Sequence, residues 1–190
     1  FNVTSYELIE KTYIINMSMV NSSNNITSTT FNYNGKSYDS TFTKINSNQY
    51  LLKKLRFSNL TLGSNSWFFN ITYINSSGTF YSKSSTNIQT INPTNFTICY
   101  HLNNVSLINF TFKDETTLEN INATITTSTF VYYITNKSIN KTYTFSNTTE
   151  NPSYSFCGTP PDKNFNVISQ MYYKYGTTYP QRFWSQVSTL

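Results

Sequence analysis

Hydrophobic and polar residues alternate along much of the chain, most clearly between residues 12 and 19. In the stretch TYIINMSM, every second residue is apolar: Tyr13, Ile15, Met17 and Met19. Successive side chains of a β-strand point to opposite faces, so this spacing predicts a strand with one buried face. Further strands are predicted at FNYNGKSYDSTF, QYLLKKLRFSNLTL, SWFFNITYIN, GTFYSKS, NFTICYHL, SLINFTF, ATITTSTFVYYIT, KTYTFS, SYSFC and FNVISQMYYKYG.

The turn residues and the amino-acid composition also favour a fold built from β-strands. Asn34-Gly35 predicts a tight hairpin, because both residues tolerate the positive φ of a type I′ turn. The sequence has one alanine, Ala123, and is rich in Thr, Ile, Tyr and Phe, which suit strands. We therefore expect an all-β, antiparallel sandwich of the Ig-like or jelly-roll type.

One short helix is expected at residues 114–121, DETTLENI. Asp114 can cap its first turn, and Thr116 with Glu119 fits a capping box. Eight residues are marginal for a helix that lacks tertiary packing.

Two segments interrupt the strands: NPTN at 92–95 and CGTPPD at 157–162. We expect an N-terminal strand segment at 1–20 and a sandwich body at 21–190. The first break either subdivides this body near 92–95 or is a long Greek-key connection.

Charge is sparse and excludes several classes of function. The net charge of +5 comes from 13 Lys and Arg against 8 Asp and Glu, without the basic run of a nucleic-acid-binding arm. No segment approaches the roughly 18 apolar residues of a membrane span. The single histidine, His101, lies near Cys99 without an identifiable orienting group, so we expect no catalytic site, no metal and no cofactor.

Cys99 and Cys157 are 58 residues apart and lack the C-x-x-C spacing of a metal or redox site. In a secreted protein they are expected to form a disulfide, worth roughly 4 kcal/mol in the chain-entropy model. Two buried free thiols are the alternative.

The sequence contains fourteen N-x-[ST] acceptor sequences for N-linked sugar. Random order of the same composition would give roughly 8, so composition explains about half of them. They begin at Asn2, Asn16, Asn21, Asn25, Asn59, Asn70, Asn75, Asn95, Asn104, Asn109, Asn122, Asn136, Asn140 and Asn147.

Strand alternation adds a second test of these sites. The Asn and the hydroxyl residue two positions on share one strand face, and the middle residue points to the other. In nine sites the middle residue is apolar, as in WFFNITYIN, where Asn70 faces outward from a core strand; most of the rest lie in expected turns. Asn104 and Asn109 differ by an odd number, which requires a bulge or a strand start between them.

Glycans on strand faces block edge pairing and proteolysis, and here they would replace charge as a solubilising coat. In its few charges and many acceptor sequences, the chain resembles the heavily glycosylated surface-filament subunits of archaea and some bacteria. The resemblance lies in composition and class. It implies an extracellular homopolymer whose β-sandwich subunits are joined by donating a terminal strand.

The corresponding donor would be the N-terminal segment, whose alternating residues could fill a neighbouring subunit's groove. The subunit-contact residues would be Phe1, Val3, Tyr6, Leu8, Tyr13, Ile15, Met17 and Met19. An ordinary first strand in its own sheet is the alternative.

A second function remains open because aromatic residues gather in MYYKYGTTYPQRFW, residues 171–184. Exposed aromatic rings stack on sugar rings. The candidate ligand surface comprises Tyr172, Tyr173, Tyr175 and Trp184. It would make the chain a carbohydrate- or receptor-binding adhesin or a virion surface glycoprotein, whereas a core strand followed by a subunit contact is the plainer alternative.

Overall fold

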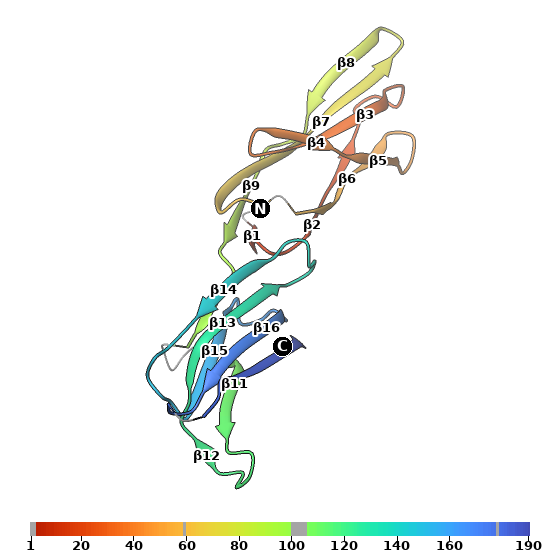
Figure 1. The fold of residues 1–190 in the computed structure, drawn as a ribbon. Coiled ribbons are helices and arrows are strands. Elements are labelled where there is room, and N and C mark those ends of the chain that lie inside the picture. Colours follow the sequence, from red (N-terminus) through yellow and green to blue (C-terminus); the bar gives the residue numbers. More distant parts are fainter. Residues whose placement is uncertain (1–2, 59, 100–105, 178) are drawn as a thin grey trace. The chain divides into compact units, whose positions relative to one another are not determined.

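The structure, a computed structural model, describes residues 3–58, 60–99, 106–177 and 179–190. In these ranges it contains strands and turns but no helix (Figure 1). The strands are β1 (Val3–Tyr6), β2 (Lys11–Ser18), β3 (Asn25–Tyr33), β4 (Lys36–Asp39), β5 (Thr41–Lys44), β6 (Gln49–Phe57), β7 (Gly63–Asn75), β8 (Gly78–Lys83), β9 (Asn87–Asn92), β10 (Asn95–Ile98), β11 (Ser106–Lys113), β12 (Asn120–Ile121), β13 (Thr124–Tyr133), β14 (Lys141–Phe145), β15 (Ser153–Thr159), β16 (Asn166–Lys174) and β17 (Arg182–Thr189).

The chain divides into two compact units, unit 1 (Phe1–Asn92) and unit 2 (Pro93–Leu190). The division falls inside the NPTN segment, where Pro93 lacks the backbone N–H that would continue a strand ladder. Strands β1 to β9 therefore belong to unit 1, and β10 to β17 belong to unit 2.

Unit 1 is a sandwich of two sheets. The larger sheet has the strand order β1-β9-β7-β3-β4, with β8 also paired to β7, and the smaller has the order β2-β6-β5. Its pairs are antiparallel except β1 with β9, which run parallel. Figure 1 shows the β7–β8 hairpin extending beyond the rest of this unit.

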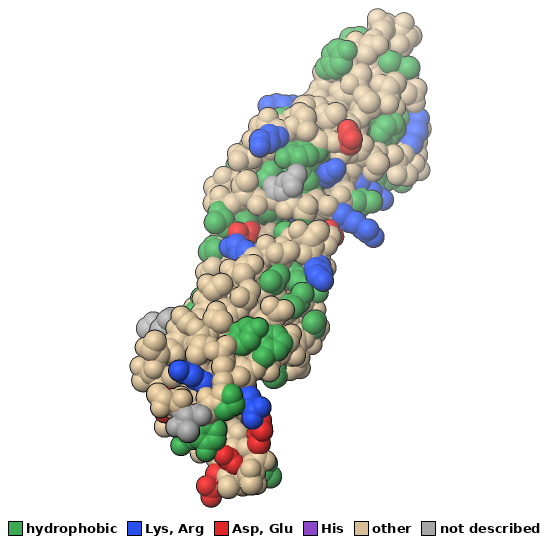
Figure 2. Space-filling model, viewed as in Figure 1, with side chains coloured by type: hydrophobic (Ala, Val, Ile, Leu, Met, Phe, Trp, Pro, Cys, Tyr) green, Lys and Arg blue, Asp and Glu red, His purple; other side chains and the backbone are tan. Residues whose placement is uncertain are grey.

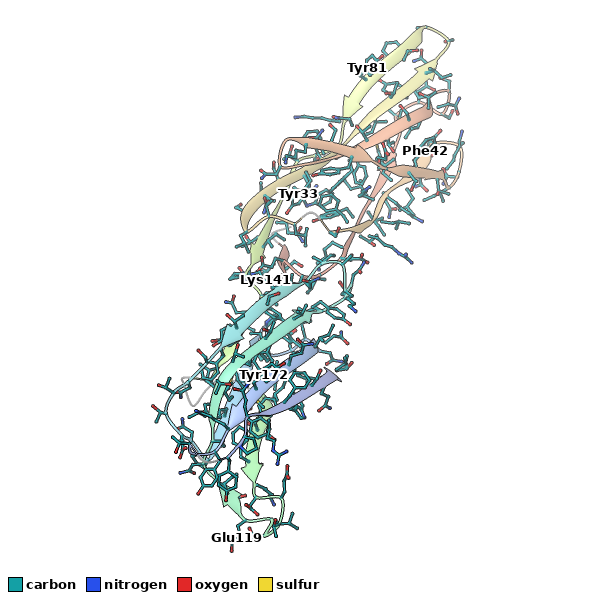
Figure 3. All side chains as sticks on the ribbon, in the orientation of Figure 1. Tyr33, Phe42, Tyr81, Glu119, Lys141 and Tyr172 are labelled. Atoms are coloured by element: carbon teal, nitrogen blue, oxygen red, sulfur yellow. A yellow bond between two sulfur atoms is a disulfide. The ribbon has the colours of Figure 1, made fainter. Side chains whose placement is uncertain are left out.

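Aromatic rings fill the core of unit 1. Phe31 lies between Tyr13 and Phe57, with ring centroids 4.7 and 5.2 Å away, and Tyr33 lies 4.9 Å from Phe57. Figure 3 shows Tyr33 between the layers. The Tyr13 hydroxyl donates a hydrogen bond to the buried Gln89, and burial raises the pKa of Tyr13. The hydroxyl hydrogen of Tyr13 and the side-chain carbonyl oxygen of Gln89 thus satisfy each other inside this core.

The predicted alternation of β2 is confirmed, since Tyr13 and Met19 are buried whereas Ile14, Asn16 and Ser18 are exposed. The predicted hairpin is confirmed as well. Residues 34 and 35 join β3 to β4 with φ values of 49° and 79°, the positive angles that a type I′ turn requires.

Unit 2 is also a two-sheet sandwich. One sheet has the order β10-β15-β11-β12, and the other has the order β14-β13-β16-β17. Its core is aromatic too: the ring of Phe156 lies 5.9 Å from that of Phe96 and 4.5 Å from that of Phe130. All three side chains are fully buried or nearly so.

The helix expected at residues 114–121 is wrong. The chain forms a turn after Lys113 and then the short strand β12, which pairs back onto β11. Asp114 does cap this turn, because its Oδ1 accepts the backbone N–H groups of Thr116 and Thr117 at 2.8 and 2.9 Å. Pairing with β11 therefore outweighs a helix of marginal length.

The N-terminal segment is paired within its own unit, which is the ordinary first-strand arrangement rather than a free donor strand. β1 pairs with β9, and β2 pairs with β6. Leu8, Tyr13 and Met19 are buried there, whereas Tyr6, Ile15 and Met17 are partly exposed. Residues 1–20 thus contribute to unit 1, not to a segment separate from the body at 21–190. Phe1 lies outside the described residues.

Candidate functional site

Eleven of the fourteen acceptor asparagines lie among the described residues; Asn2, Asn59 and Asn104 lie outside them. None of these eleven is buried. Asn70, Asn75, Asn136 and Asn147 are partly exposed, and the exposed ones are Asn16, Asn21, Asn25, Asn95, Asn109, Asn122 and Asn140. Each of these eleven positions therefore reaches the protein surface.

Asn70 illustrates the sites on strands. It lies in the middle of β7, opposite Thr30 of β3 and Lys83 of β8. Its neighbours Phe69 and Ile71 are buried, at 0% and 2% exposed. The predicted parity is therefore confirmed, because the acceptor amide lies on the outer face of a strand whose other face forms the core.

Four acceptor sites in turns share a local geometry. The Oδ1 atoms of Asn21, Asn75, Asn136 and Asn147 accept the backbone N–H of the residue two positions later, at 2.8–3.0 Å. This Asx-turn bond fixes the side-chain oxygen. It brings the hydroxyl residue of the acceptor sequence close as well: the hydroxyl of Ser138 also bonds the Oδ1 of Asn136, at 2.9 Å.

Asparagines outside acceptor sequences include the two that are buried, Asn32 and Asn65. Asn65 donates its amide hydrogens to the carbonyls of Thr61 and Gly63 at 2.6 and 2.9 Å. Asn32 donates to the Ser37 hydroxyl at 2.9 Å. These two amides are used inside the fold, unlike those of the acceptor sites.

The two alternatives expected between Asn104 and Asn109, a strand start and a bulge, both occur before Asn109, and β11 begins at Ser106. The pairing of β11 with β15 shifts register between Ser106 and Ile108. Asn109 is thereby exposed, and its Oδ1 accepts the hydroxyls of Ser106 and Ser155 at 2.8 and 2.6 Å.

The predicted disulfide between Cys99 and Cys157 is confirmed, with the Cα atoms 5.2 Å apart. It joins neighbouring strand positions, since Thr97 pairs with Cys157 and the Cys99 N–H donates to the Ser155 carbonyl. Phe156 points into the core, so Cys157 lies on the opposite face of β15.

The four residues expected to form one ligand surface are divided by the structure. Tyr172 lies on one face of its sheet with Phe183, ring centroids 4.8 Å apart. Tyr173 lies on the other face, 5.1 Å from the ring of buried Phe112. Trp184 packs against Phe110 at 4.9 Å and borders a different hollow. The expectation of a single surface is therefore wrong, because alternation along β16 separates Tyr172 from Tyr173.

Tyr173 and Tyr175 line one hollow of about 240 Å³ together with Tyr179. The end of β11 and the turn after it supply one wall; β12 adds Ile121, and the connection from β16 to β17 supplies the opposite wall. We call this the tyrosine pocket. The remaining lining residues are Lys113, Asp114, Glu115, Thr116, Lys174, Pro180 and Arg182.

Contacts between charged and polar groups hold the walls of the tyrosine pocket. The Arg182 guanidinium lies 3.2 Å from the Glu115 carboxylate and joins the walls, although both side chains are largely exposed. The N–H groups of Thr117 and Thr116 hold the pKa of Asp114 below its ordinary value. The carboxylate of Asp114 is thus committed to its own turn.

Sequence reasoning found the tyrosines but missed the charged wall. Lys113 and Glu115 are more than fifty residues from Tyr173, and only the packing of β11 opposite β16 brings them together. No local sequence pattern predicts that these two strand ends lie together, because each segment by itself looks like an ordinary strand end.

The ranges that the structure describes contain no helix long and apolar enough to cross a membrane. They also contain no group of three or more His, Cys, Asp or Glu residues placed to hold a metal ion.

No family model and no curated protein matches the chain. The solved structures that are similar to it include three of low sequence identity. A DUF4785 family protein from Legionella pneumophila shares 9% identity over 98% of this chain and 54% of that chain, with a TM-score of 0.35. The chain thus spans about half the length of that protein.

The other two are the complex of Dpr11 IG1 with DIP-gamma IG+IG2 and the chicken CNTN1 FN1-FN3 domains. Their identities are 11% and 10%, each over 98% of this chain. They match over 92% and 67% of their own chains, with TM-scores of 0.25 and 0.24. The β-sandwich assignment rests on the strand pairing described above.

Proposed function

We propose that this chain is a glycan-bearing structural segment of an extracellular surface protein. The proposal rests on where the asparagines lie. The eleven described acceptors all reach the surface, and the two buried asparagines lie outside acceptor sequences. A sugar can be attached without disturbing the core only at a position of the first kind.

The residues between acceptor and hydroxyl support the same function. In four sites this middle residue is fully buried or nearly so: Ile26, Ile71, Phe96 and Ala123. Strands with this pattern present the acceptor and its hydroxyl outward while the middle side chain stabilises the sandwich.

The shortage of charge gives the sugar a physical role. A surface of this size usually carries more charged side chains to keep it soluble and to prevent edge pairing. In Figure 2 the coloured charged groups are scattered over a surface that is mostly uncharged. Hydrated glycans would supply solubility, and the disulfide suits the oxidising exterior of a cell.

Joining of subunits by N-terminal strand donation is a less favourable form of this function. β1 and β2 would have to leave their partners β9 and β6. Their departure would expose Leu8, Tyr13 and Met19 and leave the Gln89 amide without the Tyr13 hydroxyl. Any homopolymer is therefore expected to use side-chain contacts instead.

The proposal is tested by glycopeptide mass spectrometry of protein isolated from its native source. We expect sugar on at least half of the fourteen acceptor sites, including Asn70. The variant Thr72→Ala should abolish modification of Asn70 and leave the fold intact, since Thr72 is partly exposed. Asn34 and Asn164 are exposed but lie outside acceptor sequences, so they serve as unmodified controls.

Two outcomes separate the parts of the proposal. Sugar confined to turn sites such as Asn75 and Asn136 would contradict the strand-face argument. Native protein without sugar at any site would contradict the proposed function as a whole.

A further inference from the structure

The tyrosine pocket of unit 2 has the composition of a ligand site rather than of a packing defect. Its aromatic side chains come from two segments, the end of β16 and the connection that follows. The rings of Tyr175 and Tyr179 are 5.1 Å apart and tilted by 34°. Tyr173 is held by Phe112, which is 5% exposed, so one wall is fixed to the core.

These aromatic walls favour a sugar ring. The face of an aromatic ring carries partial negative charge, and the C–H groups on one face of a pyranose carry partial positive charge. Tyrosine hydroxyls add donors and acceptors at the rim for the sugar hydroxyls. A hollow of about 240 Å³ is smaller than the roughly 300–1,000 Å³ of pockets for drug-sized ligands, so it suits one ring rather than a chain of rings.

The charges around the pocket favour an anion. Both acidic groups are occupied, Glu115 by Arg182 and Asp114 by the backbone of its turn. Lys113 and Lys174 also line the pocket, and neither has an acidic partner among the residues that the structure describes. The lining carries three cationic side chains, with Arg182 included, against two carboxylates, so one positive charge is in excess beside the aromatic walls and would attract a carboxylate on the ligand.

The distribution of acceptor sites leaves this region accessible. Residues 148–190, which include β15, β16 and β17, contain no acceptor sequence. The acceptor next to a lining residue is Asn122, which follows Ile121 and is exposed. No acceptor sequence therefore lies on β16 or on its connection to β17, which supply the aromatic walls.

From these four observations we infer that the tyrosine pocket binds the ring of an acidic sugar, a uronic-acid-type pyranose. The ring lies against Tyr175 and Tyr179, and its carboxylate faces Lys113 and Lys174. The sugar can belong to a foreign saccharide or to a glycan on a second copy of the chain, because both present the same chemistry.

Binding is tested by NMR titration of the full chain with methyl glucuronide and, as the neutral matched probe, methyl glucoside. We expect the glucuronide to shift resonances of Tyr173, Tyr175 and Tyr179 and to bind about tenfold more tightly than the glucoside. Lys174→Gln should lower that preference, because it removes one of the two lysines that face the carboxylate, and the double variant Lys113→Gln with Lys174→Gln should remove it. Equal affinities for the two probes in the unmodified sequence would overturn the acidic-sugar assignment.

The aromatic contribution is tested with Tyr179→Ala, which alters a side chain 53% exposed and should preserve the fold. We expect it to weaken both probes by about tenfold. The control is Tyr81→Ala in unit 1, at a tyrosine 82% exposed and outside the pocket. Unchanged affinity in Tyr179→Ala, or equal loss in Tyr81→Ala, would overturn the assignment.

The source of the sugar is distinguished by enzymatic removal of the chain's own glycans. Removal that abolishes self-association while methyl glucuronide still binds assigns the ligand to a second copy. Binding and self-association that both persist assign it to a foreign saccharide, and Asn122→Gln should bind the probe as the unmodified sequence does.

Discussion

Unit 1 and unit 2 each pack two sheets around aromatic rings. They differ in the covalent and hydrogen bonds of their interiors and in the features of their surfaces. Unit 1 has no cysteine and places a tyrosine hydroxyl and the Gln89 amide inside its core. Unit 2 contains the disulfide and the tyrosine pocket. Each unit has seven acceptor sequences, yet those of unit 2 end at Asn147. One architecture thus accommodates a surface with many acceptor sequences and, in unit 2, a stretch without them beside the tyrosine pocket.

The largest test of this comparison is removal of the disulfide. Cys99→Ala with Cys157→Ala should destabilise unit 2 by roughly 2–4 kcal/mol, because the open chain gains entropy when unfolded. Unit 1 should be unaffected. The two tryptophans report the units separately, since Trp67 belongs to unit 1 and Trp184 to unit 2.

Fluorescence during urea unfolding makes the measurement, with Trp184→Phe and Trp67→Phe backgrounds isolating each signal. A reducing agent should reproduce the shift in the unit 2 signal. An equal shift in both signals would show that the units unfold together and would break the comparison.

A smaller effect is expected from one added methyl group in each unit. In Gly158→Ala the new Cβ would lie 2.3 Å from Leu107 Cδ1 and 3.0 Å from the Phe165 ring, so repacking should cost unit 2 about 1–3 kcal/mol. In Gly35→Ala the Cβ has open space, and the cost of about 1 kcal/mol in unit 1 comes from the positive φ.

The same tryptophan signals measure both variants. Gly35→Asn provides the control for the hairpin, because asparagine tolerates positive φ better than alanine does, and it should lose less stability than Gly35→Ala. A Gly158→Ala protein as stable as the unmodified sequence would mean that Leu107 moves away without cost.

The smallest effect is a pH dependence confined to the turn after β11. The folded pKa of Asp114 is lowered by the N–H groups of Thr117 and Thr116. Its stabilising contribution is therefore present above the ordinary aspartate pKa, and it is lost as pH falls through the lowered folded value. NMR titration of the Thr116 and Thr117 amides should follow this loss.

Asp114→Asn provides the matched control, because it retains an acceptor oxygen without a charge. Its turn should persist and its amide shifts should become independent of acid pH. A titration of those two amides that is unchanged in Asp114→Asn would assign the pH dependence to another group.

The sequence predicted features that depend on neighbouring residues. Alternation at Tyr13 and Asn70, the positive φ at Asn34-Gly35 and the bulge before Asn109 are local consequences of strand geometry. The even cysteine count predicted the disulfide. These features need no knowledge of which strands pair.

The features that were missed depend on distant pairing. The 114–121 segment has helix caps, but β11 offers it a strand partner. Tyr172 and Tyr173 are adjacent in sequence and lie on opposite faces of one sheet, while Glu115 and Arg182 meet across 67 residues. The N-terminal strands follow the same rule, because β6 and β9, which complete them within the chain, lie far along the sequence.

The two kinds of acceptor site differ in the stage of folding at which sugar could be attached to them. The Asx turns at Asn21, Asn75, Asn136 and Asn147 involve residues two apart, so they can form before the units do and persist afterwards. Asn70 is different, because strands β3 and β8 flank it on both sides once unit 1 has folded. If the modifying enzyme needs Asn70 and Thr72 on an unpaired backbone, it would have to act before β7 pairs with β3 and β8. Sugar on Asn70 would therefore indicate that modification preceded the folding of unit 1. Sugar on the turn sites would not distinguish modification before folding from modification after it.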